Sequence, residues 1–286
     1  LIDVTLVDPC FEYRFAERGD SAEEYGRKAA AALENELLRV GSDTVMAFIA
    51  ETVVGATAGA VPPVPGYLSH VREICDRHGV LLILDEVMCG SGRTGTFLSC
   101  EQDGVIPDIV TLGKGLGAGY QPIGAVMCAT KIHEAVATGS GALQHGQTYN
   151  AHPVGCAAAL AVQGVIQEQR LLDRVHDAGA RLVSLLTSRF GNHPHVGDIR
   201  GRGLLLALEL VSDRSTKVPF DPKLSVHQRM KEEAFAGGLL IYPGGGTVDG
   251  RAGDHILLAP PYNVTDDELD MIVDLLGETI DSVLPS

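Results

Sequence analysis

The chain has 286 residues, of which 45% are hydrophobic and 21% charged, a balance typical of a soluble globular protein with a substantial core. Its 37 Asp and Glu residues outnumber its 22 Lys and Arg residues, so the formal net charge is −15. This charge would repel a nucleic-acid backbone or an anionic membrane surface, and the lack of Trp disfavours a base-stacking surface. We therefore expect neither nucleic acid nor a membrane as a partner.

Targeting and metal-binding patterns are also missing from the sequence. No apolar run approaches the roughly 18 residues that a membrane helix needs, and the N-terminus, LIDVTLVDPC, lacks the basic start of a secretory signal. The six cysteines form no CxxC pair, so the sequence predicts neither a zinc nor an iron–sulfur site. We expect free thiols in a reducing compartment, and hence a cytoplasmic protein.

Short apolar runs alternate with helical stretches in the first half of the chain. Between two such runs, residues 67–78 have helical spacing and end at Gly79. Hydrophobicity within each run is continuous rather than alternating, which is typical of parallel strands covered on both faces in an α/β fold. We predict four buried strands, at residues 45–50, 80–84, 108–112 and 123–129.

The second half begins with a long helical pattern over residues 154–190, which Gly164 and Gly179 are expected to break or bend. Asp266 and Asp267 favour the start of a final helix, because negative charge is stabilised at a helix N-terminus. We predict a first domain of residues 1–175 and a smaller α+β domain of residues 176–286. Between the long and final helices we expect a strand at 204–211, a helix at 223–236, and short strands near 239 and 256.

Two polar motifs follow predicted strands. Asp85 and Glu86 come directly after a buried strand, where a carboxylate is either a cap or a functional anion of an open α/β sheet. Lys114 lies between Gly113 and Gly115 after another strand. Alone it could be an exposed lysine in a flexible turn, and its glycines match neither a phosphate loop nor a dinucleotide-binding pattern. The glycines do clear space for the side chain and for a bound group.

Together, the lysine and the carboxylate suggest a site for pyridoxal phosphate. A lysine with a lowered pKa can form an imine with the cofactor aldehyde. A carboxylate can keep the pyridine nitrogen protonated, so that the ring acts as an electron sink. We expect Asp85 and Lys114 to face one another across the sheet edge.

The chain resembles the class III, or ω-amino acid, group of pyridoxal phosphate-dependent aminotransferases of fold type I over nearly its whole length. The resemblance implies a mainly parallel sheet flanked by helices, a smaller C-terminal α+β domain, and a homodimer with a shared active site. The stretches that match, in family order, are AETVVGATAGAVPP, LDEVMCGSGRTG, PDIVTLGKGLGAGYQPIGAV, HGQTYNAHPVGCAAALA, IRGRGLLLALELV and RAGDHILLAPPYNVT.

The resemblance also implies roles for single residues. Lys114 would bind the cofactor aldehyde and move the proton between substrate and cofactor. Asp85 would pair with the pyridine nitrogen, and Val87 would pack behind the ring. Thr148 would bind the cofactor phosphate of the neighbouring subunit.

Two further residues match positions that the family uses for substrate. Glu51 would lie near the substrate pocket, and Arg251 would bind a substrate carboxylate through its fork of donors and swing aside for an apolar amine. Each residue also has a simpler interpretation. Glu51 could pair with any nearby cation, Arg251 could be a solvated loop residue, and Thr148 could cap the helix that begins near Pro153.

The sequence departs from the family pattern in three places. Thr52 stands where many members have Pro, a change expected to affect only loop stiffness. Met88 stands where several branches have Gln, which favours amine or ω-amino acid:pyruvate enzymes over γ-aminobutyrate and ornithine enzymes. The family also has a long preceding segment with a phosphate-binding turn and an aromatic residue that stacks on the ring. We therefore expect this chain to be the C-terminal portion of a longer enzyme.

These inferences predict an aminotransferase. It would move an amino group from an amine or ω-amino acid to a keto acid such as pyruvate by a ping-pong Schiff-base mechanism. An aminomutase or decarboxylating relative with the same lysine and aspartate is one alternative, and a catalytically inactive fragment is the other.

Overall fold

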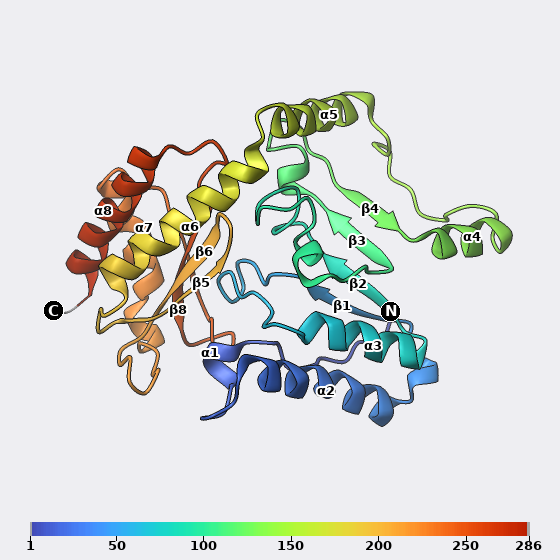
Figure 1. Ribbon diagram of the computed structural model, residues 1–286, viewed down its shortest axis with the longest axis horizontal. Coiled ribbons are helices and arrows are strands. Elements are labelled where there is room, and N and C mark those ends of the chain that lie inside the picture. Colours follow the sequence, from blue (N-terminus) through green and yellow to red (C-terminus); the bar gives the residue numbers. More distant parts are fainter. Residues whose placement is uncertain (1, 285–286) are drawn as a thin grey trace. The chain divides into compact units, whose positions relative to one another are not determined.

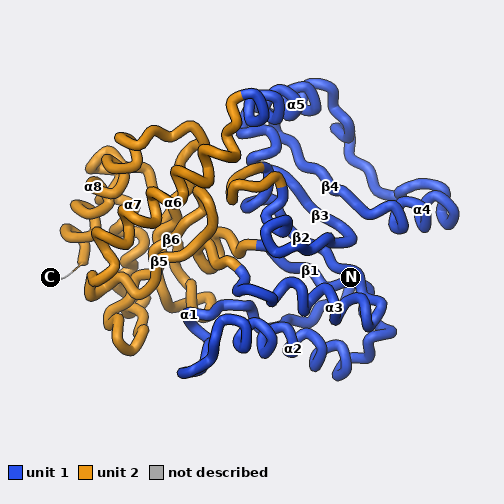
Figure 2. The backbone as a smooth tube through the Cα atoms, viewed as in Figure 1, with its two compact units in different colours: residues 1–52, 63–91, 98–168 blue, residues 53–62, 92–97, 169–286 orange. Residues whose placement is uncertain are grey.

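The structure is a computed structural model that describes residues 2–284. The chain forms two compact units (Figure 2), which we call the first and the second unit. The two domains predicted from the sequence, residues 1–175 and 176–286, stay a prediction. Among the described residues, no helix is both long and apolar enough to cross a membrane. The first unit comprises residues 1–52, 63–91 and 98–168, and the second comprises residues 53–62, 92–97 and 169–286.

The first unit contains a four-stranded sheet whose strands follow one another in chain order (Figure 1). The first three strands pair in parallel, but the fourth pairs antiparallel with the third, contrary to the expected parallel arrangement. The reason is that residues 113–124 form no α-helix, which a parallel crossover normally uses, but only a short 3₁₀ helix, η3 (Lys114–Leu116). The strands are β1 (Ala47–Glu51), β2 (Leu81–Asp85), β3 (Ile109–Leu112) and β4 (Ala125–Cys128).

Two helices pack with one face of this sheet, α2 (Ala22–Val40) and α3 (Tyr67–His78) (Figure 1). A capping box between Ser21 and Glu24 starts α2, and Gly79, with a φ of 69°, ends α3 where the sequence predicts. Apolar side chains of both helices and of β2 form the core of the unit, among them Leu33, Leu37, Leu68, Val71, Leu82 and Leu84.

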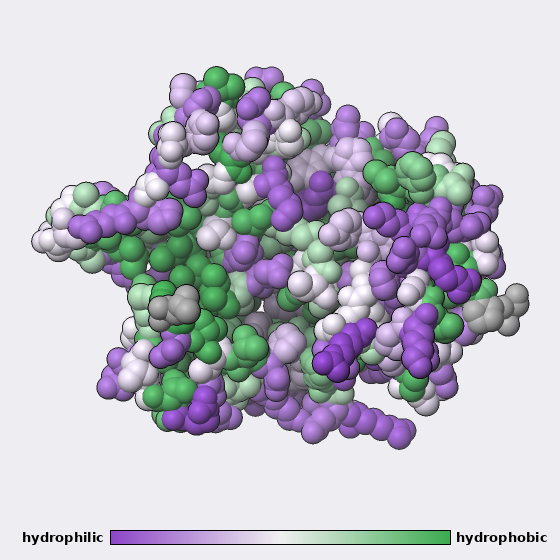
Figure 3. Space-filling model, turned by 180° about the vertical axis from the view of Figure 1, so that it is seen from behind, coloured by the Kyte–Doolittle hydropathy of each residue, from purple (hydrophilic) through white to green (hydrophobic). Residues whose placement is uncertain are grey.

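The outer strands of the sheet are less covered than their apolar sequences predict. Ile49 in β1 is 61% exposed and Val126 in β4 is 72% exposed, so the expectation of burial on both faces is wrong there. Figure 3 shows apolar side chains at the surface of the first unit, on the left in that view. The remaining helices of this unit are α1 (Glu12–Phe15), α4 (Thr130–Thr138), α5 (Pro153–Glu168), η1 (Ser42–Thr44) and η2 (Ser99–Asp103).

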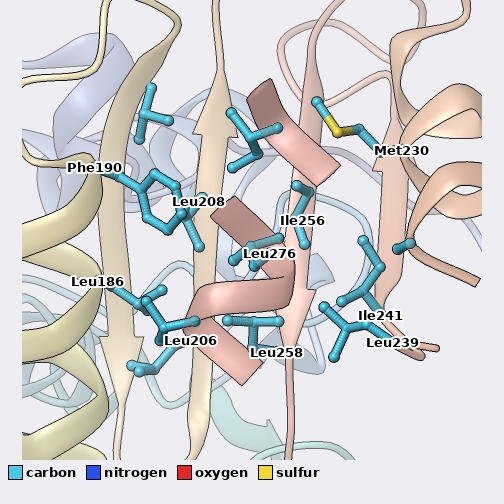
Figure 4. Close-up of a cluster of buried hydrophobic side chains, with 14 of the residues drawn as sticks. Leu186, Phe190, Leu206, Leu208, Met230, Leu239, Ile241, Ile256, Leu258 and Leu276 are labelled. Atoms are coloured by element: carbon cyan, nitrogen blue, oxygen red, sulfur yellow. The ribbon is translucent and has the colours of Figure 1, made fainter. Parts of the chain in front are cut away.

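The second unit is built on a four-stranded antiparallel sheet in the order β5-β6-β8-β7. Its strands are β5 (Val196–Arg202), β6 (Leu205–Leu210), β7 (Tyr242–Gly245) and β8 (Asp254–Leu258). Every residue of β6 is buried. Its Leu206, Leu208 and Leu210 belong to one apolar cluster with Phe190, Met230 and Leu276 (Figure 4). The helices of this unit are α6 (Leu171–Phe190), α7 (Val226–Ala236), α8 (Asp266–Val283) and η4 (Pro222–Leu224).

Three predictions for this half of the chain need correction. The long helical pattern breaks at Arg170, whose φ is 51°, and not at Gly164 or Gly179. Helix α6 runs through Gly179, where a Cβ would lie only 2.5 Å from the carbonyl oxygen of Gly203, so the missing side chain lets the turn backbone approach the helix. Strand β5 was not predicted, and β7 begins at Tyr242 rather than near residue 239.

Candidate active site

Three of the candidate residues, Glu51, Asp85 and Lys114, lie at or just after the carboxyl ends of the three parallel strands. Glu51 ends β1 and Asp85 ends β2, and the two are Cα partners in the strand register. Asp85 is in turn the partner of Thr111 in β3, which precedes Lys114 and the helix η3. The register thus brings Glu51, Asp85 and the Lys114 segment to one edge of the sheet, where ligands bind in open α/β folds.

One carboxylate oxygen of Asp85 accepts a hydrogen bond and the other is available for a ligand. The main-chain N–H of Val87 donates to its Oδ1 at 2.9 Å, which fixes the carboxylate at the start of the turn. Within the described part of the chain, Oδ2 accepts no hydrogen bond. The hydroxyl of Thr111, on the strand position beside Asp85, is buried without a hydrogen-bond partner. Buried polar groups normally have partners, so this pair of groups indicates a binding position.

Lys114 is exposed, and its φ of 38° lies in the left-handed region that side chains other than glycine rarely adopt. Across residues 2–284 its amine forms no ion pair or hydrogen bond. A Cβ on the preceding Gly113 would lie 3.3 Å from a methyl group of Val87. The glycine therefore lets the turn after β2 pack directly against the residue that precedes Lys114.

The sequence prediction missed a buried network around Glu86, which is fully buried. Its Oε1 accepts hydrogen bonds from the Thr52 hydroxyl at 2.7 Å and from the N–H of Cys100 at 2.9 Å. Its Oε2 accepts from the N–H of Ser99 at 2.8 Å and lies 3.2 Å from the Cys89 thiol. Burial raises the pKa of Cys100 to about 12, and the charge of Glu86 adds to this effect.

This network corrects the expectation that Thr52 affects only loop stiffness. Its hydroxyl is a donor to a buried carboxylate, a contact that no proline could make. The alternation of side chains along a strand is the signal that could have found Glu86. Successive side chains of a strand point to opposite faces of the sheet. If Asp85 points toward a ligand, the side chain of Glu86 therefore points toward the interior.

Thr148 and Arg251 occupy different surroundings. Thr148 lies in an exposed turn before α5, and within the described structure its side chain caps no helix. Arg251 belongs to the second unit, is exposed, and lies in the loop between β7 and β8. In that loop the carboxylate of Asp249 accepts from the N–H groups of Ala252 and Arg251 at 2.7 Å and 2.9 Å. These hydrogen bonds lower the pKa of Asp249.

Arg200 has a structural role in the second unit. It lies 2.6 Å from the buried carboxylate of Glu209 and donates to the carbonyl oxygens of Ala58 and Gly59. All six cysteines are free thiols. Among the described residues, no group of three or more His, Cys, Asp or Glu side chains could hold a metal ion.

Comparison with known proteins identifies the family. The family model for class III aminotransferases matches residues 6–280, so the chain belongs to the class III aminotransferase family. An uncharacterized aminotransferase of Schizosaccharomyces pombe is 46% identical over 97% of this chain. The match covers 61% of that relative, so the chain spans less than two thirds of its length.

Solved structures agree with the fold type I assignment. A thermostable (S)-enantioselective omega-transaminase from Thermomicrobium roseum is 35% identical, with a TM-score of 0.90 over 98% of this chain and 60% of its own. An amine transaminase from an uncultivated Pseudomonas species, solved in its PLP-bound form, is 36% identical, with a TM-score of 0.89 over 97% of this chain and 61% of its own. Class III aminotransferases depend on pyridoxal 5'-phosphate, so the residues at the sheet edge should match the groups of that cofactor.

The residues at the sheet edge fit the cofactor. Pyridoxal phosphate needs an accessible amine, an anion for its pyridine nitrogen and an apolar surface for its ring. The edge offers the amine of Lys114, the open oxygen of Asp85 and the half-buried side chain of Val87. The buried Thr111 hydroxyl without a partner lies at the same edge.

Proposed function

We propose that this chain carries the lysine and aspartate of a pyridoxal phosphate-dependent aminotransferase. The observation that supports it most is that Asp85, with one carboxylate oxygen free of hydrogen bonds in the described structure, ends β2 and that Lys114, whose amine forms no ion pair there, follows the adjacent strand β3 at the same edge of the sheet. Membership of the class III family and the PLP-bound relative add independent support.

The four candidate cofactor-binding residues of the first unit, Lys114, Asp85, Val87 and Thr148, each have a distinct role in this proposal. The Lys114 amine is the nucleophile that holds the cofactor and the base that moves the substrate proton. Asp85 Oδ2 would accept the hydrogen bond of the protonated pyridine nitrogen, and Val87 would support one face of the ring. When bound, pyridoxal phosphate supplies an electron sink that stabilises negative charge at the substrate carbon. Thr148 would bind the cofactor phosphate of a second subunit, which makes a homodimer part of the proposal.

The proposed substrates are an amine or ω-amino acid as donor and a keto acid such as pyruvate as acceptor, in a ping-pong reaction. Met88, half-buried one residue after Val87, supports the amine or ω-amino acid type. Relatives named as an omega-transaminase and an amine transaminase point the same way. Arg251 is proposed to bind the acceptor carboxylate, Glu51 to line the substrate pocket, and a cytoplasmic location remains a prediction.

A half-reaction tests the proposal. The protein is saturated with pyridoxal phosphate, an amine donor is added without acceptor, and the absorbance of the bound cofactor is followed. We expect the visible band to disappear with the wild-type chain and with Lys223→Ala, a control at another exposed lysine. Lys114→Ala should slow the reaction by at least about 100-fold, because it removes both nucleophile and base.

The alternatives predict other outcomes. A chain that binds no cofactor, or binds it without any half-reaction, would be the inactive fragment. Rearrangement of one amino acid without transfer to a keto acid would identify an aminomutase, and release of carbon dioxide would identify a decarboxylating enzyme.

A further inference from the structure

Glu86 is a buried carboxylate directly beside the proposed cofactor ligand Asp85. Its side chain is fully buried, and no cation of the described chain forms an ion pair with it. Burial of a carboxylate is unfavourable unless hydrogen-bond donors replace the lost water. Two main-chain N–H groups, one hydroxyl and one thiol take that place, at 2.7 to 3.2 Å. Hydrogen bonds to a charged acceptor are stronger and shorter than neutral ones, so they hold their geometry well.

The donors come from segments that are far apart in the sequence. Thr52 follows β1, Ser99 and Cys100 begin η2, and Cys89 lies in the turn after β2. The main chain adds two links at the same place. The N–H of Glu86 donates to the carbonyl oxygen of Thr111 in β3 at 3.0 Å, and the N–H of Thr52 donates to the carbonyl oxygen of Asp85 at 3.3 Å.

These contacts tie together the three strand ends that carry Glu51, Asp85 and the Lys114 segment. The carbonyl oxygen of Asp85 accepts the N–H of Thr52, and the residue that follows Asp85 in the chain is the buried Glu86. A shift of Glu86 would move the Asp85 carboxylate, because the two residues share a peptide bond and Asp85 has only one side-chain hydrogen bond of its own, from Val87. Small displacements of a group that contacts a cofactor have large effects on binding.

We propose that Glu86, through its hydrogen bond with Thr52, is a positioning residue for the cofactor: it sets the place of the Asp85 carboxylate. The inference rests on the proposed function, because it assumes that Asp85 contacts the cofactor. Glu86 itself touches no cofactor, so its effect has to appear in cofactor affinity beyond any loss of stability.

A second buried carboxylate of the same sheet provides the control. Asp108 is 5% exposed and precedes β3, at the end of that strand away from Lys114. It accepts from the N–H of Leu82 at 2.7 Å and pairs with Arg72 and Lys131. Loss of its charge should destabilise the first unit without moving Asp85.

The experiment compares Glu86→Gln and Asp108→Asn with the wild-type chain. Urea unfolding without cofactor measures the stability of each protein, and absorbance titration measures the dissociation constant of pyridoxal phosphate well below every unfolding midpoint. In Glu86→Gln an amide N–H group faces the N–H of Ser99 or of Cys100, so the network has to rearrange. We expect cofactor affinity to fall at least about tenfold, with a shifted absorbance maximum, whereas Asp108→Asn changes affinity by no more than about twofold.

Position 52 gives a milder pair of variants that remains informative if Glu86→Gln does not fold. Thr52→Val keeps the shape and removes the hydroxyl, whereas Thr52→Ser keeps the hydroxyl. We expect Thr52→Val to weaken cofactor binding by about three- to tenfold and Thr52→Ser to restore it to within about twofold of wild type.

The outcomes separate this inference from the proposed function. If the wild-type chain binds pyridoxal phosphate but Glu86→Gln and Asp108→Asn lose affinity equally, or Thr52→Val and Thr52→Ser behave alike, Glu86 is only a stabilising residue and the inference is overturned. If the wild-type chain itself does not bind the cofactor, the proposed function fails first and the inference fails with it.

Discussion

Replacement of Gly179 by alanine should destabilise the second unit, although the same change stabilises most helices. Gly179 lies in the middle of α6 and is buried. A Cβ at this position would lie 2.5 Å from the carbonyl oxygen, 2.7 Å from the carbonyl carbon and 2.9 Å from the Cα of Gly203. All three are main-chain atoms of the turn between β5 and β6, so no flexible side chain can move aside.

The net effect follows from two opposing contributions. Alanine favours the helix over glycine by about 1 kcal/mol. Overpacking of a tight contact costs typically about 1–3 kcal/mol, and a clash with main-chain atoms belongs at the upper end of that range. We therefore expect a net loss of about 2 kcal/mol in the free energy of unfolding. For a chain of 286 residues, with an unfolding entropy of about 2.1 cal/mol/K per residue, that loss corresponds to a decrease in Tm of about 3 °C.

Gly164 in α5 is a matched control, because a Cβ there would meet nothing within 4 Å. Gly164→Ala should raise the free energy of unfolding by about 0.5–1 kcal/mol. Calorimetry and urea unfolding of both variants provide the test. A neutral or stabilising Gly179→Ala would show that α6 and the turn at Gly203 do not approach this closely in solution.

Three further predictions concern the second unit. Burial, with the charge of Arg200 nearby, lowers the pKa of His255 from 6.5 to about 4. In this pH range the unfolded chain binds a proton at His255 more readily than the folded chain does. The stability associated with neutral His255 is therefore complete above pH 6.5 and decreases as the pH falls toward 4, by about 3 kcal/mol in all. Urea unfolding of wild type and His255→Asn across this range should show a shallower pH dependence for the variant, and parallel curves would contradict the assignment. Arg200→Met should destabilise the protein by about 3–5 kcal/mol, because it removes the guanidinium from the buried carboxylate of Glu209; a loss below about 1 kcal/mol in urea unfolding would argue against this ion pair. Arg251→Ala should raise KM for the keto acid about tenfold and change KM for an apolar amine by no more than about twofold, whereas equal losses for both would refute the proposed carboxylate-binding role.

Hydrophobic pattern and end signals were sufficient to predict much of the fold. The helix at Tyr67–His78 ends at a glycine with positive φ, and the final helix begins with a cap and three acidic residues, Asp266, Asp267 and Glu268. Such signals act between residues only a few positions apart, so the sequence alone is enough to locate these helix ends. The direction of β4 depends on how residues 113–124 cross the sheet edge, and no local pattern encodes that path.

Contacts between distant residues explain the remaining differences. Gly179 was expected to interrupt a helix, yet its lack of a side chain accommodates Gly203, which follows 24 positions later (203 − 179). The Asp85 and Lys114 motifs could be placed at strand ends from the sequence, because each follows an apolar run. The partners of Glu86 could not, since Thr52 and Cys100 lie 34 and 14 positions away in the chain.

The central claim is a covalent bond between Lys114 and pyridoxal phosphate, and borohydride reduction followed by intact-mass measurement tests it most directly. We expect reduction with the cofactor present to add one phosphopyridoxyl group per chain, and peptide mapping to place that group on Lys114. No adduct, or an adduct spread over other lysines and unchanged in Lys114→Ala, would contradict the account.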